Sequence, residues 1–178
     1  MNPNEKINDY EYHKFRAFIS SRVKRKPIAY ITGEKSFWKY NFKINEKVLI
    51  PRPDTEIIVE QVFKIYEKKR SINFLEIGIG SGCIILSILK EKKSFLGKGI
   101  DVSIESLKVC KENANKLGLL NRLKLFNSDI DNFHLGKYDL IISNPPYIKK
   151  LDFNKMDDEV VKYEPKIALD GGLDGLLE

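Results

Sequence analysis

The four consecutive residues Asn144, Pro145, Pro146 and Tyr147 are the part of the chain best suited to chemistry. The carbonyl groups of the Asn144 side chain and the Pro145 backbone can accept hydrogen bonds from both N–H groups of an amide or aromatic amine. Such a nitrogen attacks poorly because its lone pair is delocalised, so holding it in place is useful. Two adjacent prolines fix φ and remove two backbone donors, which stiffens the corner. Tyr147 offers a flat face. The segment predicts a site for methyl transfer to a planar nitrogen, although an ordinary proline loop gives the same residues.

A glycine-rich turn supplies the second candidate site. Residues 73–77 predict a short apolar strand, and a mostly apolar helix is predicted from Cys83 onward. The turn between them consists of Gly78, Ile79, Gly80, Ser81 and Gly82. Glycines there permit a tight turn and close approach of the backbone to a ligand. The G-x-G-x-G spacing lacks the third glycine of the dinucleotide fingerprint, so the turn favours a nucleoside-type ligand over a pyrophosphate.

Asp101 follows the next predicted strand, residues 94–100, and lies 23 residues after Gly78. An acidic residue about 20 positions beyond a glycine turn, at the tip of the second strand, is placed to bind ribose hydroxyls. Asp101 can also begin a helix cap together with Ser103, and the two roles are compatible.

The remaining pattern predicts an α/β fold with a doubly wound, Rossmann-like sheet. Between Ser103 and Gly118, apolar residues recur at helical spacing. A third strand is predicted over residues 122–126 and a fourth, buried strand over residues 138–143, just before Asn144. Strands that alternate with helices argue for a parallel sheet. A strand order of 3-2-1-4 would place the glycine turn beside Asn144, at the carboxyl ends of strands one and four.

The chain resembles the HemK-type (PrmC-type) release factor glutamine methyltransferases from about Arg22 to its end. The resemblance rests on five blocks, residues 25–33, 49–56, 76–82, 143–148 and 163–176. The fourth block alone also admits nucleic acid amino-methyltransferases. The Pro-Arg-Pro-Asp-Thr-Glu string in the second block is narrower, since a related branch that methylates a ribosomal protein usually departs from it.

This resemblance implies a class I methyltransferase fold and S-adenosylmethionine as the cofactor. It implies that the substrate is the glutamine in the Gly-Gly-Gln motif of class I peptide chain release factors. The implied cofactor-binding residues are Gly78, Ile79, Gly80, Ser81, Gly82, Asp101, Asp129, Ile130 and Asn144. The implied substrate-binding residues are Asn144, Pro145, Pro146 and Tyr147, of which Asn144, Pro145 and Tyr147 are catalytic. The chain departs from the usual family residues at Glu76, Ile79 and Ile130.

The expected mechanism is direct displacement, in which positioning and dipoles supply most of the catalysis. No metal site is expected, because His13 and His134 are too few and too isolated. Cys83 and Cys110 fall on predicted buried helix faces and are interpreted as core thiols. Two cysteines give no disulfide framework and suit a reducing, cytoplasmic compartment.

The composition bounds the class of protein. The chain has 178 residues, a length that allows about one domain, and 42% are hydrophobic. No apolar run approaches the length of a membrane span, and the first twenty residues do not resemble a signal peptide. The net charge of +6 suits either an RNA or acidic partner or simply a lysine-rich surface. Direct nucleic acid binding is not favoured, since the basic clusters lack interleaved aromatic residues.

The two ends of the chain have their own organisation. Residues 5–26 predict an amphipathic helix, residues 36–50 a β-hairpin, and Asp54 or Thr55 a cap for the following helix. We interpret residues 1–35 as the remnant of a helical substrate-binding domain. We interpret residues 36–178 as a methyltransferase domain that is incomplete at its C-terminus, because only four of the family's seven strands are readable. The fourth strand is then expected at an exposed edge of the sheet.

Three functions remain open at this level. The first is a release factor glutamine methyltransferase, or the larger part of one. The second is a non-catalytic remnant that binds the cofactor weakly or does not fold alone. The third is a nucleic acid adenine or cytosine N-methyltransferase, which shares the Asn-Pro-Pro-Tyr chemistry but does not explain residues 52–56.

Overall fold

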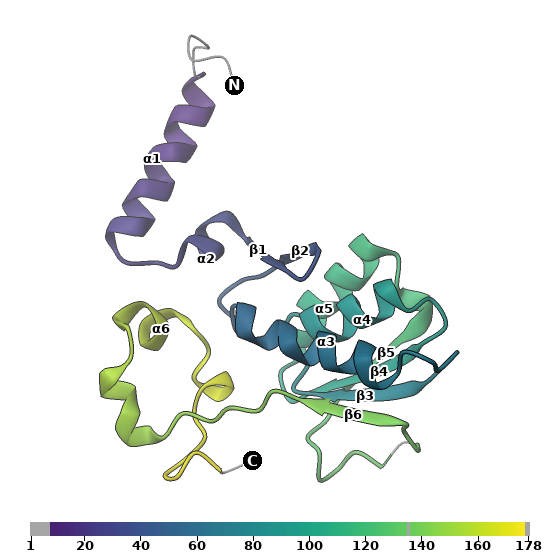
Figure 1. The fold of residues 1–178 in the computed structure, drawn as a ribbon. Coiled ribbons are helices and arrows are strands. Elements are labelled where there is room, and N and C mark those ends of the chain that lie inside the picture. Colours follow the sequence, from purple (N-terminus) through teal and green to yellow (C-terminus); the bar gives the residue numbers. More distant parts are fainter. Residues whose placement is uncertain (1–7, 135, 177–178) are drawn as a thin grey trace.

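A four-stranded parallel sheet forms the centre of the computed structural model, which describes residues 8–134 and 136–176. Its strands are β3 (Asn73–Ile77), β4 (Leu96–Asp101), β5 (Leu123–Asn127) and β6 (Leu140–Ser143). The strand order is β5-β4-β3-β6, with every neighbouring pair parallel. The predicted order 3-2-1-4 is therefore confirmed, and the ends of β3 and β6 lie side by side (Figure 1).

Three helices pack together on one face of this sheet (Figure 1). They are α3 (Glu56–Ile65), α4 (Cys83–Glu91) and α5 (Ile104–Leu117). The central helix, α4, is buried from Ile84 to Leu89 because it has the sheet below it and a helix on either side. Gly97 in β4 lets Ile85 approach the sheet, since a Cβ there would lie 2.8 Å from the Cδ1 atom of Ile85. The buried core therefore centres on α4, whose side chains pack with those of β3, α3, α5 and residues 37–42.

Strand β6 is an edge strand among the described residues, since β3 is its only partner in the sheet. The expectation of an exposed edge is confirmed. The prediction that the strand is buried holds for only one side. Ile142 is 5% exposed and packs in the core, whereas Ile141 is 57% exposed because successive side chains of a strand point to opposite faces of the sheet.

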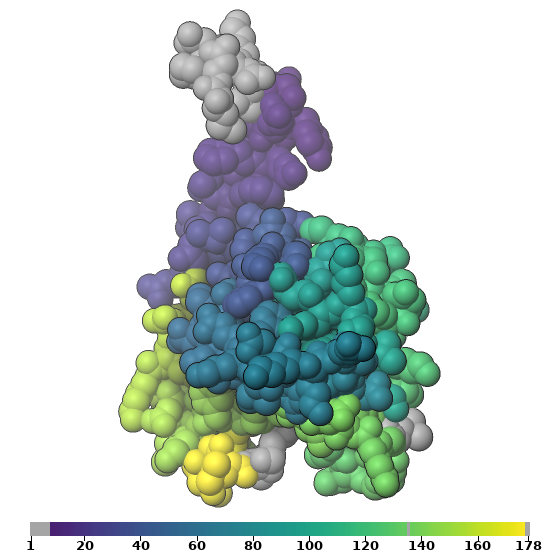
Figure 2. All heavy atoms as spheres, turned by 45° about the vertical axis from the view of Figure 1, so that its right-hand side comes forward, coloured from purple at the N-terminus to yellow at the C-terminus, as the bar shows by residue number. Residues whose placement is uncertain are grey.

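The chain before the sheet contains α1 (Asp9–Val23), α2 (Ile28–Thr32), β1 (Glu34–Phe37) and β2 (Tyr40–Lys43). Asn8 and Glu11 form a capping box that starts α1. The first three residues of the predicted helix, 5–7, lie outside the described residues. Figures 1 and 2 show α1 standing away from the body of the protein, and Tyr12, Phe15 and Ile19 on it are exposed.

The end of α1 is tied to a segment far along the sequence. Arg22 pairs with Glu159, and Arg25 pairs with Asp158, both at 2.5 Å. These carboxylates belong to α6 (Asp158–Tyr163) and precede its Tyr163, whose hydroxyl donates to the carbonyl of Lys24. Part of the basic cluster at residues 22–26 therefore faces acidic groups of the same chain.

Three local predictions need correction. The hairpin ends at Lys43, and the later part of the range, residues 44–50, forms no strand. Thr55 takes the N-cap position of α3 as predicted, but its side chain makes no capping hydrogen bond, because residues Pro53–Thr55 form a 3-10 turn that leads directly into the helix. The spacing of Ile58, Val62 and Ile65 predicts one apolar face for α3, but Ile65 is 67% exposed, since it lies in the last turn of this outer helix.

The chain after β6 leaves the sheet and forms a separate lobe that contains α6, at the left of Figure 1. It contains the 3-10 turns η3 (Lys150–Lys155) and η4 (Lys166–Ala168) on either side of α6, while η2 (Leu120–Arg122) precedes β5. None of the helices in the described ranges is both long enough and apolar enough to cross a membrane.

Candidate active site

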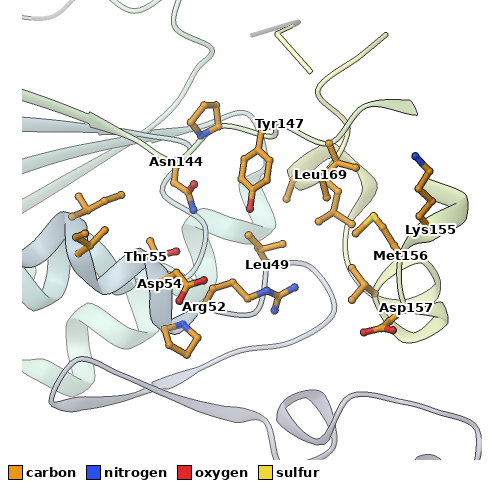
Figure 3. Close-up of a pocket in the computed structure, with 17 residues that line it drawn as sticks. Leu49, Arg52, Asp54, Thr55, Asn144, Tyr147, Lys155, Met156, Asp157 and Leu169 are labelled. Atoms are coloured by element: carbon orange, nitrogen blue, oxygen red, sulfur yellow. The ribbon is translucent and has the colours of Figure 1, made fainter. Parts of the chain in front are cut away.

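Two cavities open at the carboxyl ends of β3, β4 and β6. The larger has a volume of about 700 Å³ and lies between residues 49–58, the 144–148 corner and residues 155–169 (Figure 3). The smaller has a volume of about 500 Å³ and contains the glycine turn, Asp101, Asp129 and Ile130. Asn144 and Pro145 line both cavities. The structure thus brings the two predicted sites together at one residue pair.

The glycine turn is shaped by backbone conformation and by hydrogen bonds to β4. Gly78, Gly80 and Gly82 have φ angles of 69°, 53° and 79°, which strongly favour glycine. The N–H groups of Gly78 and Ile79 donate to the carbonyl of Ile100, at the end of β4. The N–H groups of Gly80 and Gly82 also have acceptors within the chain. Four of the five turn N–H groups are therefore already used, and few donors remain for a pyrophosphate, which such turns bind through free N–H groups.

Asp101 holds the glycine turn and the start of α5 at the same time. Its Oδ2 atom accepts from the N–H of Gly80 at 2.9 Å, and its Oδ1 atom accepts from the N–H of Ser103 at 2.8 Å. Ser103 in turn caps α5 by accepting from the N–H of Ser106. Burial raises the pKa of the Asp101 carboxyl, and the two backbone donors act against this rise. The capping role is present, and ribose binding by the same carboxylate stays a prediction.

Glu76 is a cavity residue that the sequence prediction did not assign to the site. It lies on β3, is 2% exposed, and its Oε2 atom accepts from the N–H of Ile85 at 2.9 Å. That N–H belongs to the first turn of α4, which begins after Gly82 and has no side-chain cap of its own. Glu76 therefore satisfies a helix-end donor across the glycine turn. Burial raises the pKa of its carboxyl well above the ordinary value, and the neighbouring Asp101 raises it further.

We expect Glu76→Gln to stabilise the protein increasingly as the pH rises. A raised folded-state pKa means that the unfolded state loses its proton first, so stability falls as the pH rises from about 4.5, the unfolded value, through the folded pKa. The substituted glutamine would keep an acceptor for the N–H of Ile85 without titrating. Urea unfolding of both proteins between pH 4 and pH 8 measures the difference, which should be smallest at the acidic end. If the stability difference between the parent and Glu76→Gln did not vary with pH, the raised pKa of Glu76 would be contradicted.

The remaining predicted cofactor residues lie at or beneath the smaller cavity. Asp129 and Ile130 border it, where Asp129 accepts from Asn132 and Ile130 is 49% exposed. Ile79 is 2% exposed and packs over Gly99 of β4, so its side chain supports the turn. Cys83, which was predicted to be buried, is partly exposed at the cavity, although desolvation by the surrounding protein raises the pKa of its thiol to about 12.

The 144–147 corner is held from behind by a glycine-rich segment. The N–H of Ile148 donates to the carbonyl of Leu169, and the N–H of Gly171 donates back to the carbonyl of Ile148. A Cβ on Gly171 would lie 2.8 Å from the Cα atom of Tyr147, and one on Gly175 would lie 2.7 Å from its carbonyl oxygen. These two glycines allow the chain to pack directly on the Tyr147 backbone. The Tyr147 side chain is 68% exposed, and its ring points toward residues 49–55 (Figure 3).

Four further residues line both cavities, and sequence reasoning gave none of them a role in the site. They are Leu49, Arg52, Thr55 and Ala168. All four fall within the 49–56 and 163–176 sequence blocks, so these blocks are the sequence signal that could have identified them as site residues. In Figure 3 the 49–56 block lies across from the 144–147 corner, whereas Leu169 of the 163–176 block lies beside Tyr147.

Residues 54–170 match the family model described as the methyltransferase small domain. The chain belongs to this family. Its first 33 residues match a second model, the PrmC N-terminal domain. The small-domain match spans α3, the whole sheet, the 78–82 glycine turn and the Asn-Pro-Pro-Tyr corner, so it contains most of the site described above.

Several relatives are similar over almost the whole of this methyltransferase-family chain. A release factor glutamine methyltransferase of Caulobacter vibrioides is 40% identical over 96% of the chain and 56% of its own length. One from Fusobacterium nucleatum is 42% identical over 96% of the chain and 49% of its own length. A bifunctional methyltransferase of Rickettsia conorii is 35% identical over 99% of the chain and 38% of its own length. The chain therefore spans about half of the first two relatives and less of the third.

Proposed function

We propose that this chain transfers a methyl group from S-adenosylmethionine to the side-chain amide nitrogen of a glutamine in class I peptide chain release factors. The target is the glutamine of the Gly-Gly-Gln motif. The observation that carries the proposal is that Asn144 and Pro145 line both cavities. A donor in the smaller cavity and an acceptor in the larger one would meet at these two residues. The names of the relatives from Caulobacter and Fusobacterium support the same substrate.

The lining of the smaller cavity fits S-adenosylmethionine in charge. Its ammonium and sulfonium groups outweigh its single carboxylate, so the molecule is a net cation. The ionisable residues that line this cavity are the acids Glu76, Asp101, Asp129 and Asp131 and the bases Lys47 and Arg52. Even without Glu76, whose pKa is raised by burial, the three aspartates outnumber the two bases, and the N–H groups that would favour an anion are mostly used within the turn. When bound, the cofactor supplies an electrophilic methyl group on a sulfonium that departs as a neutral thioether.

The protein's part in the reaction is to position the acceptor. Asn144 and Pro145 accept hydrogen bonds from the two N–H groups of the glutamine amide. The lone pair of the amide nitrogen is then directed at the smaller cavity. Tyr147 packs on the flat amide group from the other side. Holding reactants in this way supplies much of the rate of such a displacement without a dedicated acid or base. These roles of Asn144, Pro145 and Tyr147 belong to the proposal.

Release factors act on ribosomes, so we place the protein in the cytoplasm. The partner is a protein surface, and the larger cavity has room for a short peptide loop, at about 700 Å³. No direct contact with nucleic acid is required by this function.

The test is methyl transfer from labelled S-adenosylmethionine to a purified release factor. We expect label in the intact factor and none in a factor whose Gly-Gly-Gln glutamine is replaced by alanine. Equal labelling of both would show that another residue is the target. Labelling of DNA or RNA in place of protein would contradict the proposal and favour nucleic acid methylation. Absence of label from every substrate, together with a thermal transition that S-adenosylmethionine does not shift, would indicate a chain without activity.

A further inference from the structure

Arg52 and Glu164 form a closed ring of hydrogen bonds in the wall between the two cavities. The Nη2 atom of Arg52 donates to Oε1 of Glu164 at 2.5 Å, and its Nη1 atom donates to the carbonyl of Ile50 at 3.0 Å. The N–H of Ile50 donates to the other carboxylate oxygen of Glu164 at 3.1 Å. Arg52 and Glu164 are 112 residues apart in sequence. The ring therefore joins the segment before α3 to the segment after α6.

The buried carboxylate of Glu164 fixes the guanidinium of Arg52 in place. The side chain of Glu164 is 1% exposed, and that of Arg52 is 37% exposed. A buried carboxylate that loses its charged partner is strongly unfavourable, so the pair has little freedom to open. The other cation that borders the larger cavity, Lys155, is 79% exposed and pairs with Asp152 within its own turn. Arg52 is accordingly the rigid cation of this cavity.

The guanidinium has donors left over. Arginine carries five N–H groups in a planar fork and accepts no hydrogen bonds. Two of these groups reach Ile50 and Glu164, and Arg52 has no other acceptor in the described part of the chain. The side chain borders both cavities, across from Asn144 and Tyr147 (Figure 3). Unused donors on a fixed group at this position call for an acceptor on the bound substrate.

We propose that Arg52 binds a main-chain carbonyl of the substrate loop next to the target glutamine, and that Glu164 is the positioning residue that holds Arg52 for this contact. The inference rests on the proposed function. Two glycines precede the target, and glycine has no side chain, so only its peptide groups can be recognised. Arginine can pair only with the carbonyl of such a group. The contact would set the register of the loop, so that the glutamine reaches Asn144.

The experiment measures binding of a purified class I release factor by calorimetry in the presence of S-adenosylhomocysteine, and it needs no turnover. Arg52→Lys keeps the charge and removes the fork. We expect it to weaken binding of the release factor by about tenfold to a hundredfold, the range for a lost charge-assisted hydrogen bond. Binding of S-adenosylhomocysteine should change much less, because lysine keeps the positive charge at the smaller cavity. Arg122→Lys is the matched control, because Arg122 also donates to backbone carbonyls but lies outside both cavities.

Glu164→Gln tests the positioning role. It should weaken release factor binding in the parent chain but add little in the Arg52→Lys background, because residues that act as one unit are not additive. Full additivity would reduce Glu164 to a general stabilising residue and overturn its part of the proposal. Equal release factor affinity of the parent and Arg52→Lys would overturn the inference, and so would a parent chain that does not bind the factor. A parent chain that binds the factor through Arg52 but transfers no methyl group would contradict the proposed function alone.

Discussion

Replacing Asn144 by alanine should lower methyl transfer by about a hundredfold to a thousandfold, the effect of removing one preorganised polar group from a reacting centre. The mutation deletes the side-chain carbonyl that accepts a hydrogen bond from one N–H group of the amide. The nitrogen that receives the methyl group is then no longer directed at the smaller cavity. Cofactor affinity should change little, because the glycine turn, Asp101 and Asp129 remain in place. Single-turnover transfer of labelled methyl and calorimetric binding of S-adenosylmethionine measure the two quantities separately.

Asn127→Ala is a suitable control for this experiment. Asn127 ends β5, the outer strand on the opposite side of the sheet from β6, and borders neither cavity. Its side chain donates to the carbonyls of Asp101 and Val102. This variant should lose stability, yet transfer methyl at nearly the parental rate well below its melting temperature. If Asn144→Ala lost cofactor affinity by the same factor as transfer, Asn144 would act through the cofactor and not on the glutamine.

Most of the sheet and the glycine turn could be predicted because neighbouring segments bury one another. The glycine turn is followed closely by an apolar helix, α4, that packs back on β3 and β4. Asp101 was also found by local spacing, and it contacts Gly80, a residue only 21 positions earlier. Turn chemistry, apolar runs and short connections therefore locate the cofactor side of the site.

The opposite wall could not be predicted in the same way. Arg52 and Glu164 lie in irregular segments with no periodic pattern, and their contact closes a loop of 112 residues. The sequence motifs identify each of these two segments but do not predict that the segments are in contact. The apolar spacing in α1 has a similar limit. It predicts a helix with an apolar side, but Phe15 and Ile19 are exposed, since the pattern does not specify which segment would cover that side.

Gly171→Ala should reduce methyl transfer by about a hundredfold, because a displacement of roughly 1 Å at a reacting group can have an effect of that size. The new Cβ atom would lie 2.8 Å from the Cα atom of Tyr147 and 2.9 Å from the Cα atom of Gly175. Both are backbone atoms, so no flexible side chain can move aside, and the 144–147 corner must shift. The φ angle of Gly171 is not in the left-handed region, so alanine itself is not strained there. Cofactor affinity should be unchanged, because Gly171 borders neither cavity.

Gly118→Ala separates this steric effect from a loss of stability. Gly118 ends α5 with a φ angle of 71°, and a Cβ there meets no atom within 4 Å. Alanine at this position should cost about 1–2 kcal/mol of stability through its left-handed backbone, without touching the site. Transfer kinetics and urea unfolding should therefore rank the two variants differently. Gly171→Ala should be slow even where it is fully folded, and Gly118→Ala should be less stable but active. If Gly171→Ala kept the parental rate, the segment behind Tyr147 would have no part in holding the corner.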